Sequence, residues 1–412
     1  MCCLGGKAVS ALRQWPYVST CLRPLSLTLE RHVHPTSAYF TSRRPLSLWG
    51  SSKTDDWNKA MSEAEKIVGY PTSYLSLRCL LSDEMSNVAL HVRRLVGTKH
   101  PLLQTAKHLI YDGKNGLQTR GLIVLLMAKT AGRPSSDGYD KDLSNQQQQV
   151  NDASSGITER QRQLAEITEV IHTAYLIHKG VVNLDGLQAA DGSCRDMEFG
   201  NKMAILSGDF LLASACRGLA SLRNTKVVEM ISTSIGHMME AEFALSRDRL
   251  NNPLPSLDIT IDTWQQTTFN ASASLVANSC QSAVALVGHG EEVQTHAYEY
   301  GKNMGFAHQL HLDLQSFEED DCGPASLHSA PTVFLQLESA GSSLLNQLCK
   351  VTEASAFNYR ELKKQVSVSG ALEKTKELRN FYSQRALNAL NQFSKSDASR
   401  SLESIIKVMS NS

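Results

Sequence analysis

The sequence has no long uninterrupted apolar segment. Its longest strongly apolar run, residues 122–128, is far shorter than the about 20 residues that a helix needs to cross a bilayer. We therefore expect no transmembrane segment. An excess of charge is missing too, because 41 basic residues balance 41 acidic ones. This balance gives no reason to expect nucleic acid or an anionic membrane surface as the main partner.

Closely spaced cysteines are also missing after residue 54. None of the nine cysteines forms a C-x-x-C pair, which argues against a zinc site and a disulfide framework. We expect the cysteines after residue 54 to be small core residues in a reducing compartment. These are Cys79, Cys194, Cys216, Cys280, Cys322 and Cys349. The sequence contains no P-loop, dinucleotide fingerprint or nucleophile elbow either.

Acidic residues are scarce in the first 54 residues. This segment holds one acid, Glu30, against seven basic residues, and it is rich in Ser, Leu and Arg. Such a composition is typical of a mitochondrial transit peptide, so we predict a location in the mitochondrial matrix and cleavage shortly after Arg43 and Arg44. An ordinary disordered basic tail is the alternative. A secretory signal is disfavoured because Ser and Thr interrupt residues 25–29.

Apolar residues recur at steps of three and four along the rest of the chain, as expected for helices. The segments with this pattern are 74–96, 117–131, 157–178, 199–222, 227–245, 261–287, 293–317 and 372–393. No alternating segment suggests a sheet. We therefore predict one all-α domain over residues 55–412. Residues 133–156 are polar and contain four consecutive glutamines, so we predict a flexible insertion there.

Two segments carry a resemblance to a known family. Residues 169–183 read EVIHTAYLIHKGVVN, and residues 199–215 read FGNKMAILSGDFLLASA. They resemble trans-isoprenyl diphosphate synthases. There, a Glu-x-Ile-His-Thr-Ala-x-Leu-x-His lead-in precedes an Asp-Asp-x-x-Asp motif, and a Gly-Asn-Lys-x-Ala-x-Leu-x-Gly-Asp-Phe-Leu-Leu helix follows. The resemblance implies the isoprenoid synthase helical bundle.

Weaker similarity lies on both sides of these segments. Residues 113–126 look like the family's diphosphate-binding segment, and Ala271 and Ser272 stand where the family has a Lys-Thr pair. Residues 300–309 lead into the place of a second aspartate motif. The resemblance implies four remnants that could still contact a diphosphate: Arg120, Lys202, Gln309 and Asp313.

In the family the two aspartate motifs hold magnesium. Carboxylates at i, i+1 and i+4 project to one side of a helix, and two such helices form an oxygen-lined site. The ions neutralise the charge that grows on the diphosphate as it leaves. Here the corresponding positions are Lys179, Gly180 and Asn183 in the first motif, and Leu312, Asp313 and Ser316 in the second. One carboxylate remains, and Lys179 would repel a divalent cation. We predict no catalytic residue and no metal in this chain.

Other residues have both a functional and a structural interpretation. By resemblance, Ala174 and Tyr175 line the product tunnel, where Tyr175 would either block elongation or simply pack in the core. The spacing of His308 and His311 allows zinc, but packing is favoured because Asp313 is the sole third ligand in view.

Three further features have structural interpretations. We expect His172 and His178 to be structural, and the acidic run 318–321 to be a solvated loop. Residues 206–212, with Gly208 permitting close approach, are predicted to form a helix contact between subunits.

The resemblance extends to the degenerate, non-catalytic subunits of heteromeric synthases that make decaprenyl-type chains. It implies a catalytic partner subunit that binds Mg²⁺, in a hetero-oligomer such as a heterotetramer. The complex would build the ubiquinone side chain from isopentenyl diphosphate and an allylic primer. Two alternatives stay open: a self-sufficient prenyltransferase with an unconventional metal site, and a module that binds polyprenyl lipid.

Overall fold

The computed structural model of the chain describes residues 52–69, 93–103, 105–106, 119–134, 156–244, 246–252, 254, 260–318, 327–338 and 358–411. In these ranges every regular element is a helix, which confirms the predicted all-α fold. The elements are α1 (Ser52–Val68), η1 (Arg93–Leu95), α5 (Thr119–Ala131), α7 (Glu159–His178), η2 (Ala189–Asp191), α8 (Cys194–Ser221), α9 (Thr225–Phe243), α10 (Ile261–Thr268), η3 (Phe269–Ala273), α11 (Ser274–Ala285), α12 (Glu291–Glu318), α13 (Ala330–Glu338), α15 (Tyr359–Val368), α16 (Ala371–Leu390) and α17 (Asp397–Asn411).

Most predicted helical segments coincide with observed helices within a few residues. The segment 261–287 is one continuous path made of α10, the π-helical turn η3 and α11. The prediction missed α17, although its buried residues Leu402, Ile405, Ile406 and Met409 recur at helical spacing. Several predicted features lie outside the described residues: most of the segment 74–96, the leader up to residue 51, the insertion from 135 to 155, and the acidic residues 319–321.

Helix α7, which ends at His178, has a defined start. Thr158 accepts a hydrogen bond from the backbone of Gln161, while the Gln161 side chain accepts one from the backbone of Thr158, forming a capping box. The following long helix, α8, begins at Ser193, whose hydroxyl accepts from the backbone of Asp196. Caps at both starts fix the α7–α8 pair that carries the family-like segments.

Helix α5 forms the centre of the core. Residues 122–128, the longest apolar run of the sequence, are each at most 1% exposed. A helix that is apolar on all sides is stable when neighbours surround it. Here α5 packs against α1, α7, α11 and α17. The run is therefore a buried core helix.

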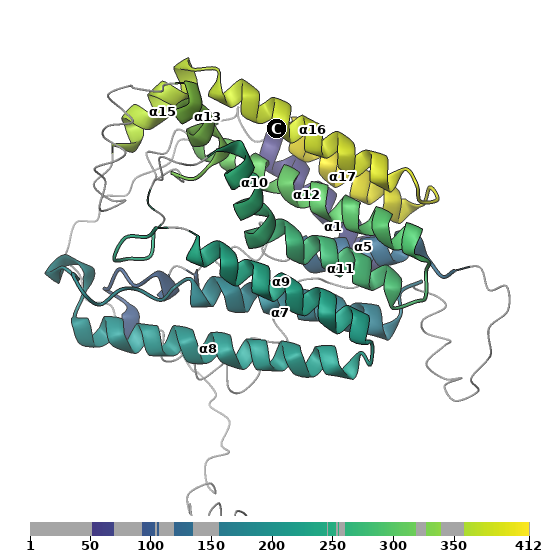
Figure 1. The fold of residues 1–412 in the computed structure, drawn as a ribbon, viewed down its shortest axis with the longest axis horizontal. Coiled ribbons are helices and arrows are strands. Elements are labelled where there is room, and N and C mark those ends of the chain that lie inside the picture. The colour runs from purple at the N-terminus through teal and green to yellow at the C-terminus, as the bar shows by residue number, and fades with distance from the viewer. Residues whose placement is uncertain are drawn as a thin grey trace, which may run out of the picture. The chain divides into compact units, whose positions relative to one another are not determined.

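The other helices pack around this core (Figure 1). Helix α12 lies along α11 and α16, α17 contacts α1 and α5, and α7 runs beside α8. Helix α8 lies at the edge of the bundle and packs mainly on α7. Among the described helices it alone is long and apolar enough to cross a membrane by length and composition, and 33% of its most apolar window is buried.

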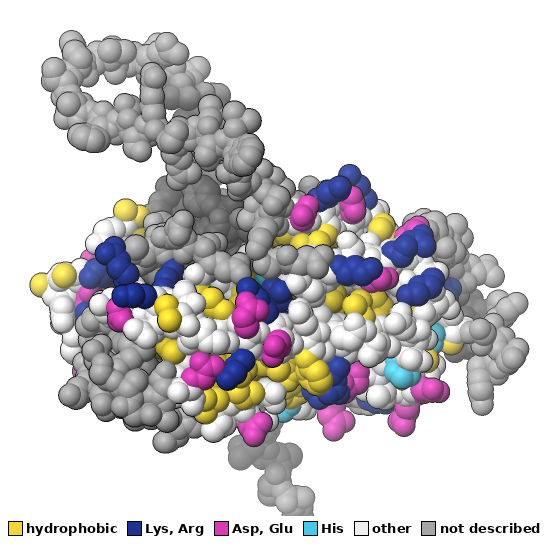
Figure 2. Space-filling view, turned by 90° about the horizontal axis from the view of Figure 1, so that it is seen from above, with side chains coloured by type: hydrophobic (Ala, Val, Ile, Leu, Met, Phe, Trp, Pro, Cys, Tyr) yellow, Lys and Arg dark blue, Asp and Glu magenta, His cyan; other side chains and the backbone are white. Residues whose placement is uncertain are grey.

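The surface on the side of α16 and α17 carries charges of both signs. Figure 2 shows basic and acidic side chains interspersed with small apolar areas on this face. Mixed charge of this kind is typical of a solvated surface. The described residues on this face therefore form no concentrated positive patch of the kind that binds nucleic acid.

The cysteines are only partly where we predicted them. Cys280 is buried in α11, as expected, but Cys194 and Cys216 are exposed, so the prediction is wrong for these two. The reason is that both lie on the side of α8 that this chain leaves uncovered. The remaining three, Cys79, Cys322 and Cys349, lie outside the described residues.

Candidate functional site

Lys179 follows the last residue of α7, at the place expected for the first metal-binding carboxylate. Its Nζ atom is 3.5 Å from Oε1 of Glu242, near the end of α9, and 5.2 Å from the centre of the Tyr175 ring. Burial lowers the pKa of Lys179, while Glu242 acts in the opposite direction. The amine is thus held by a carboxylate and an aromatic face of its own chain.

Glu242 is shared by several side chains. The Tyr175 hydroxyl donates a hydrogen bond to Oε1, and the Arg247 guanidinium donates to Oε2. The side chains of Arg247 and Glu242 are 13% and 21% exposed, so water screens this pair weakly. Two protein cations, Lys179 and Arg247, therefore neutralise one carboxylate where a synthase would gather metal ions.

The two other positions of the first motif lie against the backbone. A Cβ atom at Gly180 would lie 3.2 Å from the amide nitrogen of Leu102, so an aspartate there would require its neighbours to move. Asn183 is exposed, and its Oδ1 accepts from the backbone of Asp185 at 3.0 Å. Neither position offers a carboxylate.

The turn formed by residues 246–252 lies against the segment that follows α7. The Asn251 side chain donates to the carbonyl of Lys179 at 2.6 Å. The backbone amide of Asn183 donates to the carbonyl of Arg249 at 3.0 Å. The degenerate motif is therefore fixed at both ends by this turn.

Asp313 is the remaining carboxylate of the second motif. It is 5% exposed. Its Oδ1 accepts from the Gln309 side chain, and its Oδ2 accepts from the backbone of Ala330, both at 2.8 Å. The Trp264 indole also donates to it, yet burial dominates and raises the pKa of Asp313 to about 6. Because Ala330 begins α13, Asp313 caps that helix.

The second motif as a whole does not fit magnesium. Leu312 is 43% exposed and apolar, and the Ser316 hydroxyl donates to the carbonyl of Asp313. The oxygens of Asp313 already have partners within the chain. Among the side chains that the structure describes, no group of three His, Cys, Asp or Glu residues could hold a metal ion.

The predicted diphosphate remnants do not form one site. Arg120 lies at the start of α5, and Gln309 and Asp313 bond to each other on α12. Lys202 is exposed on α8, which packs mainly on α7. Lys202 therefore does not line the small cavity beside α5 that Arg120 lines.

That cavity is small and lies between α5, η3, α11 and α12. Arg120, Ser272 and His308 line it. Burial lowers the pKa of His308 to about 3, so at neutral pH Arg120 is the cation of the three. Trp57 stacks over His308 and His311, with ring centres 6.0 and 6.2 Å away. Both histidines thus have an aromatic packing partner.

The comparisons with known proteins identify the family. Residues 100–322 match the polyprenyl synthetase family. The chain is 46% identical to the rat protein named all trans-polyprenyl-diphosphate synthase PDSS2, over 89% of this chain and 92% of that one. This chain belongs to the polyprenyl synthetase family.

Two further polyprenyl synthetases extend the similarity. A protein of Neurospora crassa, named a probable mitochondrial hexaprenyl pyrophosphate synthase, is 32% identical over 90% of each chain. The apo structure of an Arabidopsis medium/long-chain length prenyl pyrophosphate synthase is 29% identical, with a TM-score of 0.52, covering 80% of this chain and 96% of that one. The fold of the family is therefore present along most of this chain.

The segments that resemble other polyprenyl synthetases have packing roles here. The His178 ring lies so close to Gly208 that a Cβ atom there would overlap it. The Asn201 side chain makes two hydrogen bonds with the loop after α7. Its Oδ1 accepts from the Val182 amide and its Nδ2 donates to the Val182 carbonyl, both at 2.8 Å. We expected Gly208 to permit close approach between subunits. This was wrong, because Gly208 faces α7 and is buried within the chain.

Glu169 of the synthetase-like lead-in supports the start of α5. It is 1% exposed, and its Oε1 accepts from the backbone of Gly121 at 2.6 Å. Burial raises its pKa to about 7, although this hydrogen bond and the charge of Arg120 act in the opposite direction. Glu169 thus caps the N-terminus of the core helix α5.

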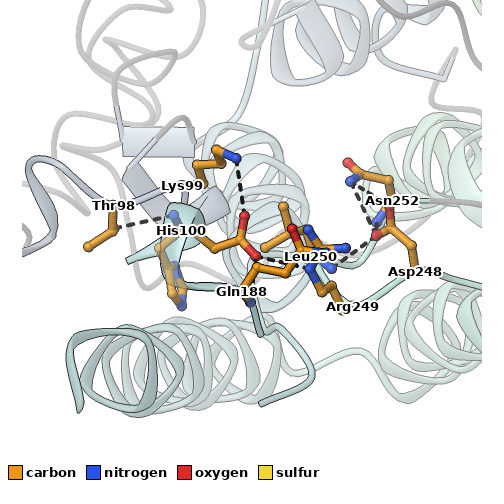
Figure 3. Close-up of polar contacts among 9 residues, drawn as sticks. Thr98, Lys99, His100, Gln188, Asp248, Arg249, Leu250 and Asn252 are labelled. Atoms are coloured by element: carbon orange, nitrogen blue, oxygen red, sulfur yellow. Dashed lines mark hydrogen bonds and ion pairs between the residues drawn. The ribbon is translucent and has the colours of Figure 1, made fainter. Parts of the chain in front are cut away.

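Asp191 joins three segments through Lys99, Gln188 and Arg249, which Figure 3 labels. Its fully buried carboxylate accepts from Arg249 at 2.9 Å and from Lys99 at 3.1 Å. The Gln188 backbone donates to it as well, and these partners lower the pKa of Asp191 to about 2. The network attaches the turn 246–252 to η2 and to the segment before residue 101.

Sequence reasoning did not find Glu242, Arg247 or Asp191. Glu242 and Arg247 are five residues apart across the end of α9, so their proximity was open to prediction. Their contact with Lys179 was not, because helical periodicity does not specify which helix ends meet. Tyr175 is 6% exposed and packs in the core. Its role in a product tunnel stays a prediction.

Proposed function

We propose that this chain is a non-catalytic subunit of a heteromeric trans-polyprenyl diphosphate synthase. It binds a homologous catalytic subunit that bears both aspartate motifs and holds Mg²⁺. The complex extends an allylic primer with isopentenyl diphosphate and makes the polyprenyl side chain of ubiquinone. We place it in the mitochondrial matrix, in a hetero-oligomer such as a heterotetramer.

The observation that carries this proposal is the cluster of Lys179, Glu242 and Arg247. In a synthase, metal ions compensate the charge that develops on the leaving diphosphate. Here the positive charge belongs to side chains that already pair with Glu242. Among the side chains that the structure describes around Lys179, this arrangement leaves no set of oxygens to bind metal. Chemistry on the substrate must therefore occur in another subunit, while the preserved fold provides a homologous surface to bind it.

The relatives support this proposal in two ways. The rat protein at 46% identity is named a trans-polyprenyl-diphosphate synthase. The Neurospora relative carries a mitochondrial designation, in agreement with the composition of residues 1–54.

Reconstitution tests the proposal. The chain, the motif-bearing homologue and the co-expressed pair are each given magnesium, farnesyl diphosphate and labelled isopentenyl diphosphate. We expect polyprenyl product from the pair and none from this chain alone. Product from this chain alone would instead establish a self-sufficient prenyltransferase. Unchanged synthesis by the homologue without this chain, together with saturable polyprenyl binding by this chain, would establish a lipid-binding module.

Matched substitutions in the two subunits determine which of them carries out prenyl transfer. Replacing the first-motif aspartates of the homologue by alanine should abolish synthesis. Lys179→Ala in this chain should leave the turnover of the assembled pair within about twofold, because Lys179 contacts no reacting atom. A loss of synthesis from Lys179→Ala in an intact complex would contradict the proposal.

A further inference from the structure

A second, larger cavity lies between α10, η3, α12 and α16, on the side of the bundle away from α8 (Figure 1). Its volume is about 630 Å³, within the range of about 300–1,000 Å³ that small-molecule sites occupy. Ten residues line it. Two of them, Phe269 and Phe306, are wholly apolar, and the other eight carry a charge, an amide or a hydroxyl. This lining favours a polar ligand over a prenyl chain.

One end of this cavity is built from aromatic rings. Phe306 of α12 and Tyr382 of α16 stack with ring centres 4.5 Å apart, and the ring centre of Phe269 in η3 is 6.5 Å from that of Phe306. Phe306 and Tyr382 are buried in the core, which holds their rings in place. The Tyr382 hydroxyl bonds to the side chain of Gln265, joining α16 to α10. Rings fixed in this way provide a rigid surface on which a planar group can stack.

The other end of the cavity carries two cations. Lys302 precedes Phe306 by four residues on α12, and Arg385 follows Tyr382 by three residues on α16, so the cations lie about one helical turn from the rings. Both are near Glu299, at 3.8 and 3.9 Å, distances too long for hydrogen bonds. Their side chains are 34% and 52% exposed, so their N–H groups can donate to an anion.

An amide and a carboxylate add hydrogen-bond acceptors to the lining. Asn303 is 2% exposed, and its Nδ2 donates to the backbone carbonyl and the carboxylate of Glu299. Its Oδ1 has no partner among the described residues and can accept from an amino group. Asp262 is exposed in the first turn of α10 and lines the same cavity. A carboxylate of this kind accepts from the hydroxyls of ribose.

We propose that this cavity binds a nucleoside phosphate. The base stacks on the rings of Phe269 and Tyr382, the phosphates accept from Lys302 and Arg385, and the ribose hydroxyls donate to Asp262. Rings and cations about one turn apart require a ligand whose planar group and anion are joined by a spacer, which ribose provides. An aromatic carboxylate lacks the spacer, and a prenyl diphosphate lacks the ring. The site goes beyond the proposed function, because it involves neither the degenerate motifs nor a partner subunit.

Binding of adenosine diphosphate (ADP) to the full chain tests this inference. Calorimetry without magnesium compares ADP with adenosine and with inorganic pyrophosphate, each of which offers one half of the recognised chemistry. We expect ADP to bind at least about tenfold more tightly than either. Equal affinities for ADP and pyrophosphate, or no binding at millimolar ADP, would overturn the inference.

Two variants separate the contributions of the two ends. Arg385→Ala should weaken ADP binding at least about fivefold and leave adenosine binding unchanged, because it removes a phosphate contact alone. Phe269→Leu keeps an apolar side chain but removes the ring. It should weaken ADP and adenosine binding at least about fivefold and leave pyrophosphate binding unchanged. The matched control is Arg400→Ala, since Arg400 is an exposed arginine that pairs with Asp397, and it should bind ADP like the wild type.

The same measurements distinguish other occupants of the cavity. If Arg385→Ala binds ADP like the wild type, the nucleotide binds elsewhere and the inference fails, whether or not Phe269→Leu folds. Displacement of ADP by farnesyl diphosphate would also overturn the inference, because the cavity would then recognise a diphosphate without a ring. Neither result bears on the proposed function, since these assays contain no partner subunit and measure no synthesis.

Discussion

Glu242 is contacted by side chains from three parts of the sequence. Tyr175 and Lys179 come from the end of α7, and Arg247 comes from the turn after α9. Taking charges out of water costs free energy, and the mutual attraction of the charges offsets this cost only if all partners are present. Loss of Glu242 should therefore leave two cations near each other without compensation.

Glu242→Gln should lower the free energy of unfolding by about 1–3 kcal/mol. The lower part of this range is expected, because the Lys179 side chain is 39% exposed and partly screened. Urea denaturation measures the change. Glu377→Gln, at an exposed position of α16, is the control and should stay within about 0.5 kcal/mol of the wild type. Equal midpoints for both variants would contradict the role of Glu242.

Glu169 should make stability depend on pH in a defined direction. Burial raises its pKa from 4.5 to about 7 in the folded chain. Between these values the folded state keeps a proton that the unfolded state has lost. The contribution of Glu169 to stability is therefore complete below about pH 4.5 and is lost as the pH rises through about 7.

Glu169→Gln should remove this dependence, because the amide does not titrate. The difference in unfolding free energy, wild type minus variant, should fall by up to about 3 kcal/mol between pH 4.5 and pH 7. Taking the difference cancels the titration of groups common to both proteins, such as His172 and His308. A difference that stays constant, or rises with pH, would show that Glu169 is ionised in the folded chain throughout.

At the scale of elements, glycines set how closely α12 lies to its neighbours. A Cβ atom at Gly301 would lie 2.8 Å from Cα of Ala277 in α11. One turn later, a Cβ atom at Gly305 would lie 2.7 Å from Cα of Ala273 in η3. Both obstacles are backbone atoms, so they cannot be relieved by a side-chain rotation. The position of α12, and hence of Asp313, depends on these two glycines.

Alanine substitutions at Gly301 and Gly236 should therefore have opposite effects on the stability of the folded chain. Gly301→Ala should destabilise the chain by about 1–3 kcal/mol because α11 and α12 must separate. Gly236→Ala should stabilise it by about 0.5–1 kcal/mol, since a Cβ there meets nothing within 4 Å and alanine favours helix. Thermal unfolding of both variants measures the two signs. Destabilisation by Gly236→Ala, or none by Gly301→Ala, would refute this account.

Helix positions were largely predictable from the sequence, and their contacts were not. The start of α7 is visible in Thr158 and Gln161, which form a capping box. The meeting of Glu242 with Lys179 depends on how α7 and α9 pack, which local periodicity does not encode. The candidate site was predictable as a loss of carboxylates, because that loss can be read directly at Lys179 and Leu312. Its replacement by an internal ion-pair cluster required the structure.

At the scale of the whole molecule, the described helices are joined by contacts within the chain around both degenerate motifs. The family-like residues around the degenerate motifs make structural contacts that do not require catalysis. Glu169 caps α5, Asp313 caps α13, and His178 packs on Gly208. Loss of the other carboxylates removes none of these contacts. This explains how the bundle and much of the family sequence remain while the metal positions have changed.

Rebuilding the first motif alone should consequently not restore a metal site. We expect the triple variant Lys179→Asp, Gly180→Asp and Asn183→Asp to show no magnesium binding by calorimetry and no prenyl transfer. Arg247 would stay beside the new carboxylates, and the second motif would offer Asp313 alone, whose oxygens are bonded to Gln309 and Ala330. A folded triple variant that binds magnesium with millimolar or better affinity would show that one motif suffices. Adding Arg247→Ala, Leu312→Asp and Ser316→Asp should raise the affinity for magnesium. These changes remove the competing cation and supply carboxylate oxygens from the second motif.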